Sequence, residues 1–385
     1  MSLRILHVTP YFSEAWAYGG IPRVATAQAR GLSRLGHEVT VATTDACDAD
    51  RRLPLGWRDP HVDVRVFPNV SNRLAFHWQC YLPRGARKFL HDVVSTFDIV
   101  HIHAHRNALQ VMAADACRKA NVPYVLGPNG TAARLERRLA VKRVWDAMWG
   151  RTIIRDAAAV VAVSPAERRQ LQSLGIADRQ LHELPNPVEL SDFAEPLDAV
   201  SRTAASPVVA FLGKVTPRKR LDVVVEAMPH VTRKDARLAI AGSDMGGLAD
   251  SLRLADARGL GGRVERAGTL AGRARLAWLA AADVVVYPST DEAFGLVPVE
   301  ALLCGTPVIV ADDSGCAEVV GSLDGAQVVR AGDPRALATA IDAVLDDPQK
   351  WRAAAAIGGA AARERFGAEA VVNRLDALYR KILAH

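Results

Sequence analysis

The chain has 385 residues, of which 50% are apolar and 23% are charged, and its formal net charge is +6. This composition excludes a disordered or fibrous protein, and the length favours two domains over one hydrophobic core. Five cysteines without a CxxC spacing argue against disulfides and structural zinc and favour a reducing cytoplasm. No apolar run is long enough to cross a bilayer, and the start MSLRILHVTPYF predicts a strand, not a signal peptide.

The amino-terminal half alternates short apolar runs with helical stretches. RILHV predicts a strand, and residues 20–35 predict a helix that ends at Gly36. Further buried strands are predicted at EVTVATT, FDIVHIH, VPYVLG and AAAVVAVS. Continuous runs of Val, Ile and Ala are typical of a parallel sheet covered by helices on both faces. Residues 1–190 are therefore predicted to form a Rossmann-like domain.

Residues 131–155 carry seven basic and two acidic side chains, without a proline, and can form a helix. Five of its side chains would fall within about one quadrant of that helix: Arg134, Arg138, Lys142, Trp145 and Trp149. Cations beside tryptophans suit the headgroup layer of an anionic membrane. The alternative is a solvated helix whose tryptophans pack on the domain. Nucleic acid is not expected as a partner, because no recognised binding motif accompanies the basic residues.

Residues 184–207 are rich in proline, serine and acidic residues, which predicts a linker. The alternation then restarts, with strands predicted at PVVAFLG, ARLAIAG, ADVVVYPS and TPVIVAD and helices between them. Residues 207–368 are therefore predicted to form a second doubly wound α/β domain. Ligands bind such sheets at the carboxyl ends of the strands, so two facing domains would form a cleft lined by these ends.

The first strand of the second domain leads into GKVTPRKRLD, which holds Lys214, Arg218 and Lys219. Thr216 can cap the following helix and Pro217 can occupy its first turn. Cations beside free backbone N–H groups form an anion site, and phosphate is the anion we consider. The alternative is a basic solvated loop.

A second phosphate cue lies in STDEAFGLVPVEALLCG, between a buried strand and a helix that Gly305 ends. Glu292 lies in the loop, and Glu300 lies between one and two turns into the helix. A carboxylate beside a phosphate site must accept hydrogen bonds from another group, and sugar hydroxyls are such donors. The alternatives are that Glu292 caps the helix and that Glu300 pairs with a buried arginine.

With these residues in place, the chain resembles the retaining GT-B glycosyltransferases of family four over nearly its full length. The matching elements are Glu292-x7-Glu300 with Phe294-Gly295-Leu296 between, AADVVVYPS before it and EALLCGTPVIVADDSGCAEVV after it. Further matches are GKVTPRKRLDVVVEA, AGSDMGG, LPNPV and YGGIPRVATAQARGLSRLGHEVTV. The resemblance implies two Rossmann-like domains, with the helix at residues 369–385 packing back on the first.

The resemblance also implies roles in donor binding. Lys219 matches a lysine on the donor diphosphate, and Lys214 stands where the family usually has arginine, which keeps the charge and loses the bidentate fork. Glu292 should bind the donor sugar and Glu300 the ribose, while the N–H groups of Gly295 and Leu296 contact phosphate and sugar. Further donor contacts are expected at Phe294 and, around the base, at Gly242, Ser243, Thr269 and Leu270.

In the first domain, Gly19 and Gly20 follow the first strand, and paired glycines let a backbone approach a ligand closely. In relatives this loop lies beside the donor phosphate and the acceptor; the alternative is a flexible helix start. Arg220, in the second domain, stands where many members have glycine.

The alternating histidines of HIHAH would share one face of a strand, which superficially resembles a metal site. We expect the strand to end near Ile102, which leaves His103 at its carboxyl end and His101 within the sheet. The resemblance favours His103 as the histidine that contacts the sugar and places His105 on the acceptor side. No metal and no cofactor are expected.

We therefore predict a cytoplasmic, metal-independent glycosyltransferase with catalytic residues Glu292, His103 and Lys219. Its substrates would be a nucleotide sugar and a carbohydrate or lipid-linked acceptor in bacterial polysaccharide, lipopolysaccharide or glycolipid synthesis, at the inner face of the cell membrane if residues 131–155 bind it. The alternatives are a nucleotide-sugar epimerase of the same architecture and a non-catalytic nucleotide-sugar-binding protein.

Overall fold

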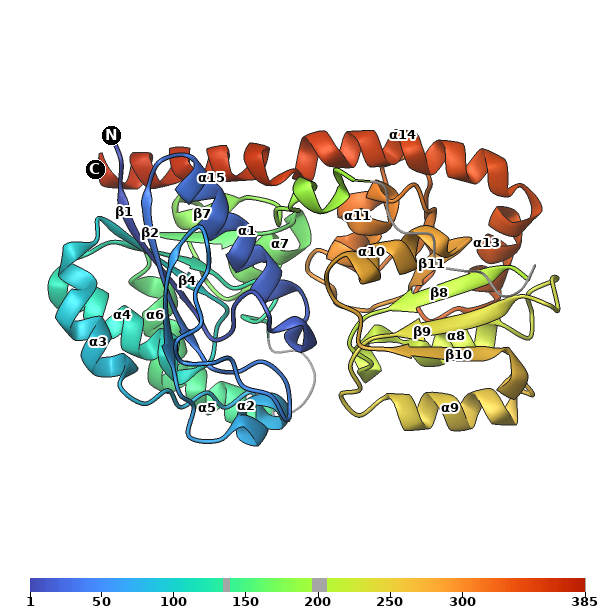
Figure 1. Ribbon diagram of the computed structural model, residues 1–385, viewed down its shortest axis with the longest axis horizontal. Helices are drawn as coiled ribbons and strands as arrows, with labels where there is room; N and C mark the ends of the chain where they lie inside the picture. Colours follow the sequence, from blue (N-terminus) through green and yellow to red (C-terminus); the bar gives the residue numbers. More distant parts are fainter. Residues whose placement is uncertain (134–138, 196–205, 385) are drawn as a thin grey trace. The chain divides into compact units, whose positions relative to one another are not determined.

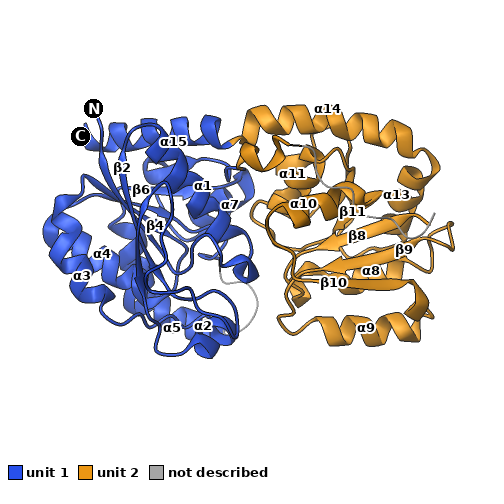
Figure 2. Ribbon diagram, in the orientation of Figure 1, with its two compact units in different colours: residues 1–188, 368–385 blue, residues 189–367 orange. Residues whose placement is uncertain are grey.

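The computed structural model describes residues 1–133, 139–195 and 206–384 (Figure 1). The chain divides into two compact units (Figure 2): unit 1 comprises residues 1–188 and 368–385, and unit 2 comprises residues 189–367. The predicted linker, residues 184–207, spans the boundary between the units, and its residues 196–205 lie outside the described part.

The described part of unit 1 contains a seven-stranded parallel sheet in the order β3-β2-β1-β4-β5-β6-β7. Its strands are β1 (Arg4–Thr9), β2 (Glu38–Thr44), β3 (Asp63–Phe67), β4 (Ile99–His103), β5 (Tyr124–Gly127), β6 (Ala159–Ala162) and β7 (Leu181–Glu183). The chain moves outward from β1 to β3 and then returns to β4 on the other side of β1. The carboxyl ends of β1 and β4 therefore form a topological switch point, the usual place for a ligand in such sheets.

Helices cover both faces of this sheet because its strands are apolar on both faces. The helices of unit 1 are α1 (Gly20–Arg34), α2 (Asn72–Trp78), α3 (Ala86–Val93), α4 (Ala108–Ala120), α5 (Leu139–Trp145), α6 (Arg151–Arg155), α7 (Pro165–Ser173) and α15 (Ala368–Leu383). One face packs against α3 and α4, and the other against α1 and α15. α15 lies close to α1 because Gly31 has no side chain: a Cβ there would be 2.6 Å from Cγ2 of Val372.

Unit 2 contains a six-stranded parallel sheet in its described part, in the order β10-β9-β8-β11-β12-β13. Its strands are β8 (Val208–Leu212), β9 (Arg237–Ala241), β10 (Val264–Gly268), β11 (Val284–Tyr287), β12 (Val308–Ala311) and β13 (Ala326–Val329). Its helices are α8 (Leu221–Ala227), α9 (Leu248–Ala257), α10 (Gly272–Ala281), α11 (Leu296–Leu303), α12 (Gly315–Val320), α13 (Pro334–Asp346) and α14 (Pro348–Phe366). The order reverses between β8 and β11, which is the switch point of this sheet.

Strands β11 and β12 of unit 2 are buried along their whole length, as their continuous apolar sequences predict. Among the described residues, no helix is both long and apolar enough to cross a bilayer.

Candidate active site

The two predicted phosphate loops of unit 2 meet at its switch point. β8 and β11 are hydrogen-bonded neighbours, so the loops that follow them leave the same edge of the sheet. The backbone N–H of Thr290 donates to the carbonyl oxygen of Arg218 at 3.0 Å, and Arg218 Nη1 donates to the carbonyl oxygen of Asp291 at 3.0 Å. Segments about 70 residues apart in the chain are thereby fixed against each other.

Lys219 is the centre of this junction. Its ammonium donates to the Glu292 carboxylate and to the Tyr287 hydroxyl, and it lies 4.4 Å from the centre of the Tyr287 ring. The Tyr287 hydroxyl also bonds to Glu292 Oε2 at 3.3 Å. Lys219 is buried, whereas Glu292 keeps 16% of its side chain exposed. The site therefore holds an acid, a cation and a phenol that contact one another, with the acid reaching solvent.

Burial and neighbouring charges shift the pKa values of Glu292 and Lys219 in opposite directions. Burial would raise the pKa of Glu292, but Lys219, Arg218 and Lys214 outweigh it and lower that pKa to about 2. Burial lowers the pKa of the Lys219 ammonium, although the carboxylate of Glu292 opposes that shift. Burial raises the pKa of Tyr287 well above its usual value, so its hydroxyl stays protonated. Glu292 is thus an anion throughout the neutral range.

The lysine loop differs in detail from its prediction. A short 3₁₀ helix, Pro217–Lys219, precedes α8, and the side chain of Thr216 makes no capping hydrogen bond to it. Arg220 joins the two at φ +53°, a left-handed conformation that glycine adopts most easily. This explains why glycine would suit the position. The Arg220 guanidinium bonds to Asp222, and Lys214 is half-buried.

Gly295 is the N-cap residue directly before α11, with φ +82°, and a Cβ there would lie 2.4 Å from Sγ of Cys316. Only glycine fits this turn without a shift of its neighbours. Helix N-termini carry unpaired N–H groups and favour anions, which is the role predicted for Gly295 and Leu296. Phe294 packs against Phe366 at 5.5 Å between ring centres, so its side chain belongs to the core of unit 2.

Glu300 lies on α11 and forms a buried ion pair with Arg275 of α10. Both side chains are at most 5% exposed. Glu300 thus has a buried arginine partner, Arg275, and its contact with the ribose stays a prediction.

The residues predicted around the base lie in the loops after β9 and β10. Gly242 has φ +136°, and a Cβ would lie 1.8 Å from the carbonyl oxygen of Gly213, so the turn after β9 touches the turn after β8. Ser243 accepts a backbone hydrogen bond from Val215 at 2.9 Å. Thr269 is exposed and Leu270 half-buried, directly before α10. Loops from four neighbouring strands therefore meet at one edge of this sheet.

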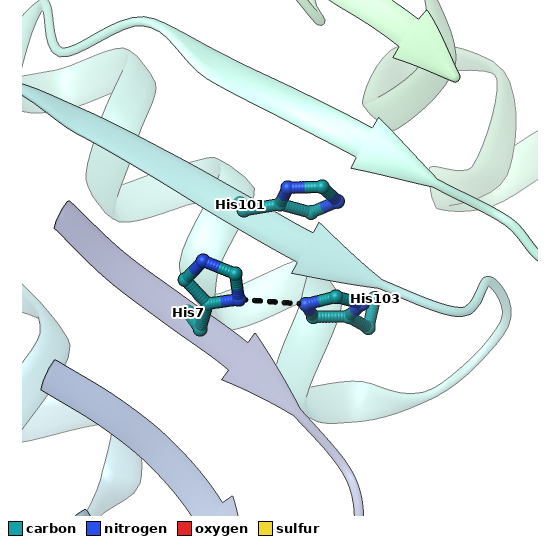
Figure 3. Close-up of side chains that lie close together, drawn as sticks. All are labelled: His7, His101 and His103. Carbon is teal, nitrogen blue, oxygen red and sulfur yellow. Dashed lines mark hydrogen bonds between the residues drawn. The ribbon is translucent and has the colours of Figure 1, made fainter. Parts of the chain in front are cut away.

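In unit 1, Gly19 has φ +85° and Gly20 begins α1, at the carboxyl side of β1. β4 extends one residue beyond the predicted end at Ile102, because His103 still pairs with Gly127 of β5. His103 therefore shares a face with His101, and its side chain is buried, hydrogen-bonded through Nε2 to Nδ1 of His7 at 2.9 Å (Figure 3).

The three histidines form a stack within the sheet. The rings of His101 and His103 are 4.4 Å apart and 8° from parallel, and His7 is tilted by 24° and 31° to them. One ring nitrogen of each lies within 4.8 Å of the others, as in a metal site. However, ring lone pairs lie in the ring planes, so nearly parallel rings do not direct them to one point. His101 instead bonds through Nδ1 to the Tyr379 hydroxyl of α15 at 2.6 Å.

The loop after β4 is strained and firmly held. Ala104 and Arg106 have φ of +65° and +67°. The Arg106 guanidinium donates to Asp146 at 2.8 Å and 2.9 Å and to the backbone carbonyls of residues 131–133. The buried His105 ring packs edge-on against Trp145. This loop therefore anchors α5 and the π-helix Asp146–Gly150.

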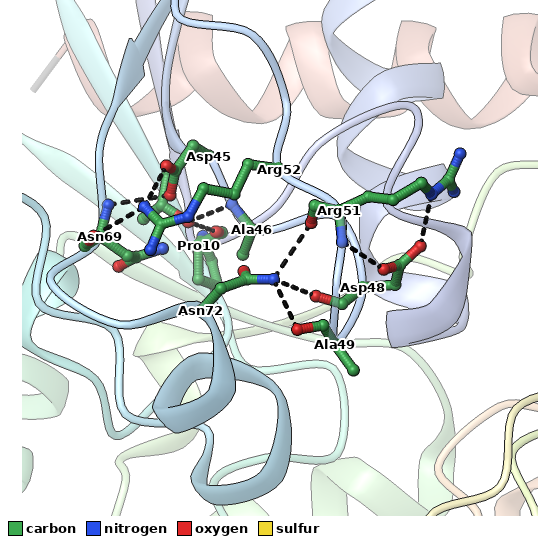
Figure 4. Close-up of polar contacts among 10 residues, drawn as sticks. Pro10, Asp45, Ala46, Asp48, Ala49, Arg51, Arg52, Asn69 and Asn72 are labelled. Atoms are coloured by element: carbon green, nitrogen blue, oxygen red, sulfur yellow. Dashed lines mark hydrogen bonds and ion pairs between the residues drawn. The ribbon is translucent and has the colours of Figure 1, made fainter.

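A polar network orders the segment after β2 (Figure 4). Asp45 accepts hydrogen bonds from Arg52 and from the backbone of Asn69, both at 2.8 Å. The Asn72 amide donates to the carbonyl oxygens of Asp48, Ala49 and Arg51. Buried polar side chains with several such bonds hold an irregular segment in one conformation.

Both halves of the chain match known glycosyltransferase families. Residues 198–363 match the family Glycosyl transferases group 1, and residues 18–192 match Glycosyltransferase Family 4. The D-inositol 3-phosphate glycosyltransferase of Xylanimonas cellulosilytica is 31% identical over 93% of this chain and 91% of the relative. The phosphatidyl-myo-inositol mannosyltransferase of Mycobacterium leprae is 28% identical over 99% and 97%. The chain belongs to the group 1 glycosyltransferases of family 4.

Solved structures confirm the predicted GT-B fold of this glycosyltransferase. Anabaena Alr3699/HepE in complex with UDP and glucose has a TM-score of 0.78 at 21% identity, over 98% of this chain and 99% of that one. Sucrose-phosphate synthase of Thermosynechococcus elongatus has a TM-score of 0.77 at 21% identity, over 99% of both. The family assignment also decides against an epimerase and a non-catalytic binding protein.

Sequence reasoning about this glycosyltransferase missed three residues that the structure brings into contact with predicted ones: Tyr287, Arg275 and His7. Tyr287 is the last residue of a buried strand, and that position alone marks it as lying at the ligand edge. His7 is a polar residue inside an otherwise apolar strand, which is a usable signal. Arg275 has no sequence signal, because nothing in the spacing identifies which arginine meets Glu300.

Proposed function

We propose that this glycosyltransferase moves a hexose from a nucleoside-diphosphate sugar to an acceptor hydroxyl with retention of configuration, giving an α linkage, without a metal ion. The contact of Lys219 with Glu292 and Tyr287 at the switch point of unit 2 is the observation that carries this proposal. An anionic acid held beside buried and half-buried cations fits a ligand that has both hydroxyls and phosphates.

The chemistry requires a diphosphate to leave, so negative charge must be stabilised as it develops. Lys214, Lys219 and the N–H groups at the start of α11 are fixed donors for that charge, and fixed donors need no reorganisation during reaction. Glu292 remains ionised beside them, which suits a contact with sugar hydroxyls and with the positive charge that develops at the anomeric carbon. His103 of unit 1 is proposed as the histidine that contacts the sugar.

Probes for the substrates follow from the relatives. HepE was solved with UDP, so UDP-sugars are the first donors to test, with GDP- and ADP-sugars beside them. Relatives named for inositol 3-phosphate and phosphatidyl-myo-inositol make inositol phosphates and lipid-linked inositol the first acceptors. We place the enzyme in the cytoplasm, in bacterial polysaccharide, lipopolysaccharide or glycolipid synthesis.

The test combines binding and turnover. A thermal-shift screen of UDP, GDP and ADP should identify one stabilising nucleotide, and its sugar should be transferred only when an acceptor is present. NMR of the product should show an α-anomeric proton from an α-linked donor, and EDTA should leave the rate unchanged. Interconversion of the donor without acceptor, a β-linked product or loss of activity in EDTA would each contradict the corresponding part of the proposal.

We also propose that α5 and the π-helix of unit 1 contact an anionic membrane. Five large apolar side chains there are at least 39% exposed: Leu139, Val141, Val144, Met148 and Trp149. Arg143 and Arg151 are exposed in the same segment. An exposed apolar stripe flanked by arginines suits the boundary between headgroups and acyl chains. Trp145 is not part of this stripe, because it packs against His105 and the core; Arg134, Arg137 and Arg138 lie outside the described residues.

Flotation with vesicles of phosphatidylglycerol and phosphatidylcholine tests the membrane contact. The protein should float at low salt, and Val144→Asp with Met148→Asp should abolish flotation while the donor-nucleotide thermal shift stays unchanged. Ile357→Asp is the matched control, since Ile357 is 62% exposed on α14 of unit 2. A wild type that stays in the lower fraction at low salt would show that the stripe is ordinary surface.

A further inference from the structure

Arg275 and Glu300 form an ion pair inside unit 2 that the family resemblance does not account for. Arg275 is the fourth residue of α10, which begins directly after the loop of Thr269 and Leu270. Glu300 is the fifth residue of α11. The guanidinium therefore joins the helix after the predicted base loop to the acid predicted to bind the ribose.

A carboxylate this deeply buried needs a compensating charge, because an unpaired buried charge is strongly unfavourable. Arginine supplies that charge through Nη1, which donates to Oε2 of Glu300, and the rigid planar guanidinium fixes the position of that oxygen. A lysine ammonium on its flexible stem would supply the charge and fix that position less well. The choice of arginine thus has a consequence for the orientation of Glu300 beyond its ionisation.

Hydrogen bonds other than this ion pair also hold α10, and they come from Thr306, which follows α11, and from Arg352 of α14. Thr306 Oγ1 donates to the carbonyl oxygen of Leu279 at 2.9 Å. Arg352 Nη1 donates to the carbonyl oxygen of Ala280 at 3.2 Å, and its Nη2 donates to that of Ala282. These bonds hold the carboxyl end of α10 in place by themselves. An orienting role for Arg275 can therefore be separated from a role in holding the helices together.

We propose that Arg275 is a positioning residue that orients the Glu300 carboxylate toward the 2′- and 3′-hydroxyls of the donor ribose, and so sets the preference for ribonucleotides over deoxyribonucleotides. This inference rests on the donor site proposed above. A carboxylate held by arginine accepts two hydroxyl hydrogen bonds at one defined place. A carboxylate free to rotate loses that geometry and retains only its charge.

The experiment measures a ratio of affinities, which general destabilisation does not change. Calorimetry gives the Kd of the stabilising diphosphate among UDP, GDP and ADP, and of its 2′,3′-dideoxy counterpart. Wild type should bind the ribonucleotide at least about tenfold more tightly, as expected for hydrogen bonds to a charged group. Arg275→Lys should reduce this ratio to about threefold or less, with the dideoxy Kd changed by less than about twofold.

Arg273→Lys is the matched control, because Arg273 lies on the same helix and bonds to the backbone carbonyls of Asp192 and Glu195. Its ratio should equal that of wild type. If Arg275→Lys does not fold, Arg275→Met combined with Glu300→Gln leaves no unpaired buried charge and should show a ratio near one.

Two results would overturn the inference while leaving the proposed function intact. In the first, wild type binds the ribonucleotide normally but no more tightly than its dideoxy counterpart. In the second, Arg275→Lys prefers the ribonucleotide as strongly as wild type does. If Arg275→Lys does not fold, the same result in the double variant counts as the second. Absence of binding by all three nucleoside diphosphates would overturn the proposed donor site itself, and this inference with it.

Discussion

Lys219 contacts both an acid and a phenol, yet it can still serve a diphosphate. An ammonium has three N–H donors, and Glu292 and Tyr287 accept two of them. The third can point to a phosphate oxygen without breaking the pair. The carboxylate of Glu292 thus compensates the charge of the buried lysine, and under the proposed function a diphosphate would add to this arrangement instead of replacing it.

Lys219→Ala should weaken nucleoside-diphosphate binding by about 100-fold. The variant loses a charge-assisted hydrogen bond and leaves Glu292 beside the phosphates without its cation. Calorimetry with the stabilising nucleotide checks the change. Lys350→Ala is the control, because Lys350 is exposed on α14 of the same unit and should bind as wild type does. Equal affinity in the two variants would remove Lys219 from the diphosphate site.

Glu292→Gln should lower turnover by about 100-fold, the size of effect expected when one electrostatic contact to a transition state is lost. Affinity for the nucleoside diphosphate should stay within about threefold, because the hydroxyl contact concerns the sugar. Initial rates and calorimetry separate the two quantities. The exposed Glu364, on α14, gives the control Glu364→Gln, and normal turnover by Glu292→Gln would exclude Glu292 from the mechanism.

At this scale the sequence could show which residue types lie at the edge of the sheet, but not their partners. Glu292 and Lys219 were predicted separately, as a sugar contact and a phosphate contact, and the structure shows that they bond to each other. Their contact depends on β8 and β11 being neighbours, and that pairing joins residues 73 positions apart. Short-range spacing carries no information about such pairs.

At the scale of elements, Gly295 lies between a buried strand and α11. Replacing it has two separable costs, backbone strain and steric overlap with Cys316. Gly295→Ala should lower the free energy of unfolding by about 2–4 kcal/mol, since alanine is strained at φ +82° and its Cβ meets Sγ of Cys316. Gly268→Ala is the matched control, because Gly268 has φ +70° and a Cβ there would have no described atom beyond its chain neighbours within 4 Å. That variant should lose only about 1–2 kcal/mol.

Urea unfolding measures both variants and a third, Gly295→Ala with Cys316→Ala. Removing Sγ relieves the steric part, so the double variant should be more stable than the sum of the single changes predicts. Equal losses in Gly295→Ala and Gly268→Ala would show that backbone strain alone makes glycine necessary at the start of α11.

Element types were predictable because apolar runs and glycine stops are local signals. β11, α11 and Gly305 follow directly from ADVVVYPS and GLVPVEALLCG. Less local features were not predictable: the 3₁₀ turn at Pro217–Lys219 depends on Arg220 adopting φ +53°, and the end of β4 depends on pairing between His103 and Gly127. Both are settled by neighbours from elsewhere in the chain.

At the scale of the whole molecule, unit 1 buries several histidines whose imidazoles are neutral. Four histidines of unit 1 are almost completely buried, His7, His101, His103 and His105, and burial lowers their pKa values, to about 3 for His101 and His105. Burial also lowers the pKa of the half-buried His182. The four almost completely buried side chains carry no charge in the folded state. Unfolding returns them to ordinary values near 6.5, where they take up protons in mild acid.

The stability that these histidines contribute is therefore fully present above pH 6.5 and is lost as the pH falls toward about 3. Below pH 6.5 the unfolded chain binds up to one more proton per histidine, which costs up to about 1.4 kcal/mol per pH unit each. Between pH 6.5 and 5.5 the four together should lower the free energy of unfolding by about 4 kcal/mol.

Glu167 changes the free energy of unfolding with pH in the direction opposite to that of the histidines. Burial raises its pKa to about 7, although the backbone N–H groups of Gly130 and Val163 oppose the shift. Its contribution is present below about pH 4.5 and is lost as the pH rises through 7, so acidification from pH 6.5 to 5.5 restores about 1 kcal/mol. The expected net loss over that range is about 3 kcal/mol.

Urea unfolding from pH 8 to pH 5.5, followed by tryptophan fluorescence, should show this loss. His105→Asn should reduce the loss between pH 6.5 and 5.5 by about 1 kcal/mol, since one proton fewer is taken up on unfolding. Glu167→Gln should increase it by a similar amount, and His61→Asn should leave it unchanged because His61 is exposed. A free energy of unfolding that is constant from pH 7 to pH 5.5 would mean that the histidines are protonated in the folded protein. His105 has an acid beside it, since its Nε2 lies 3.8 Å from Oδ1 of Asp146, but burial outweighs the charge of that acid.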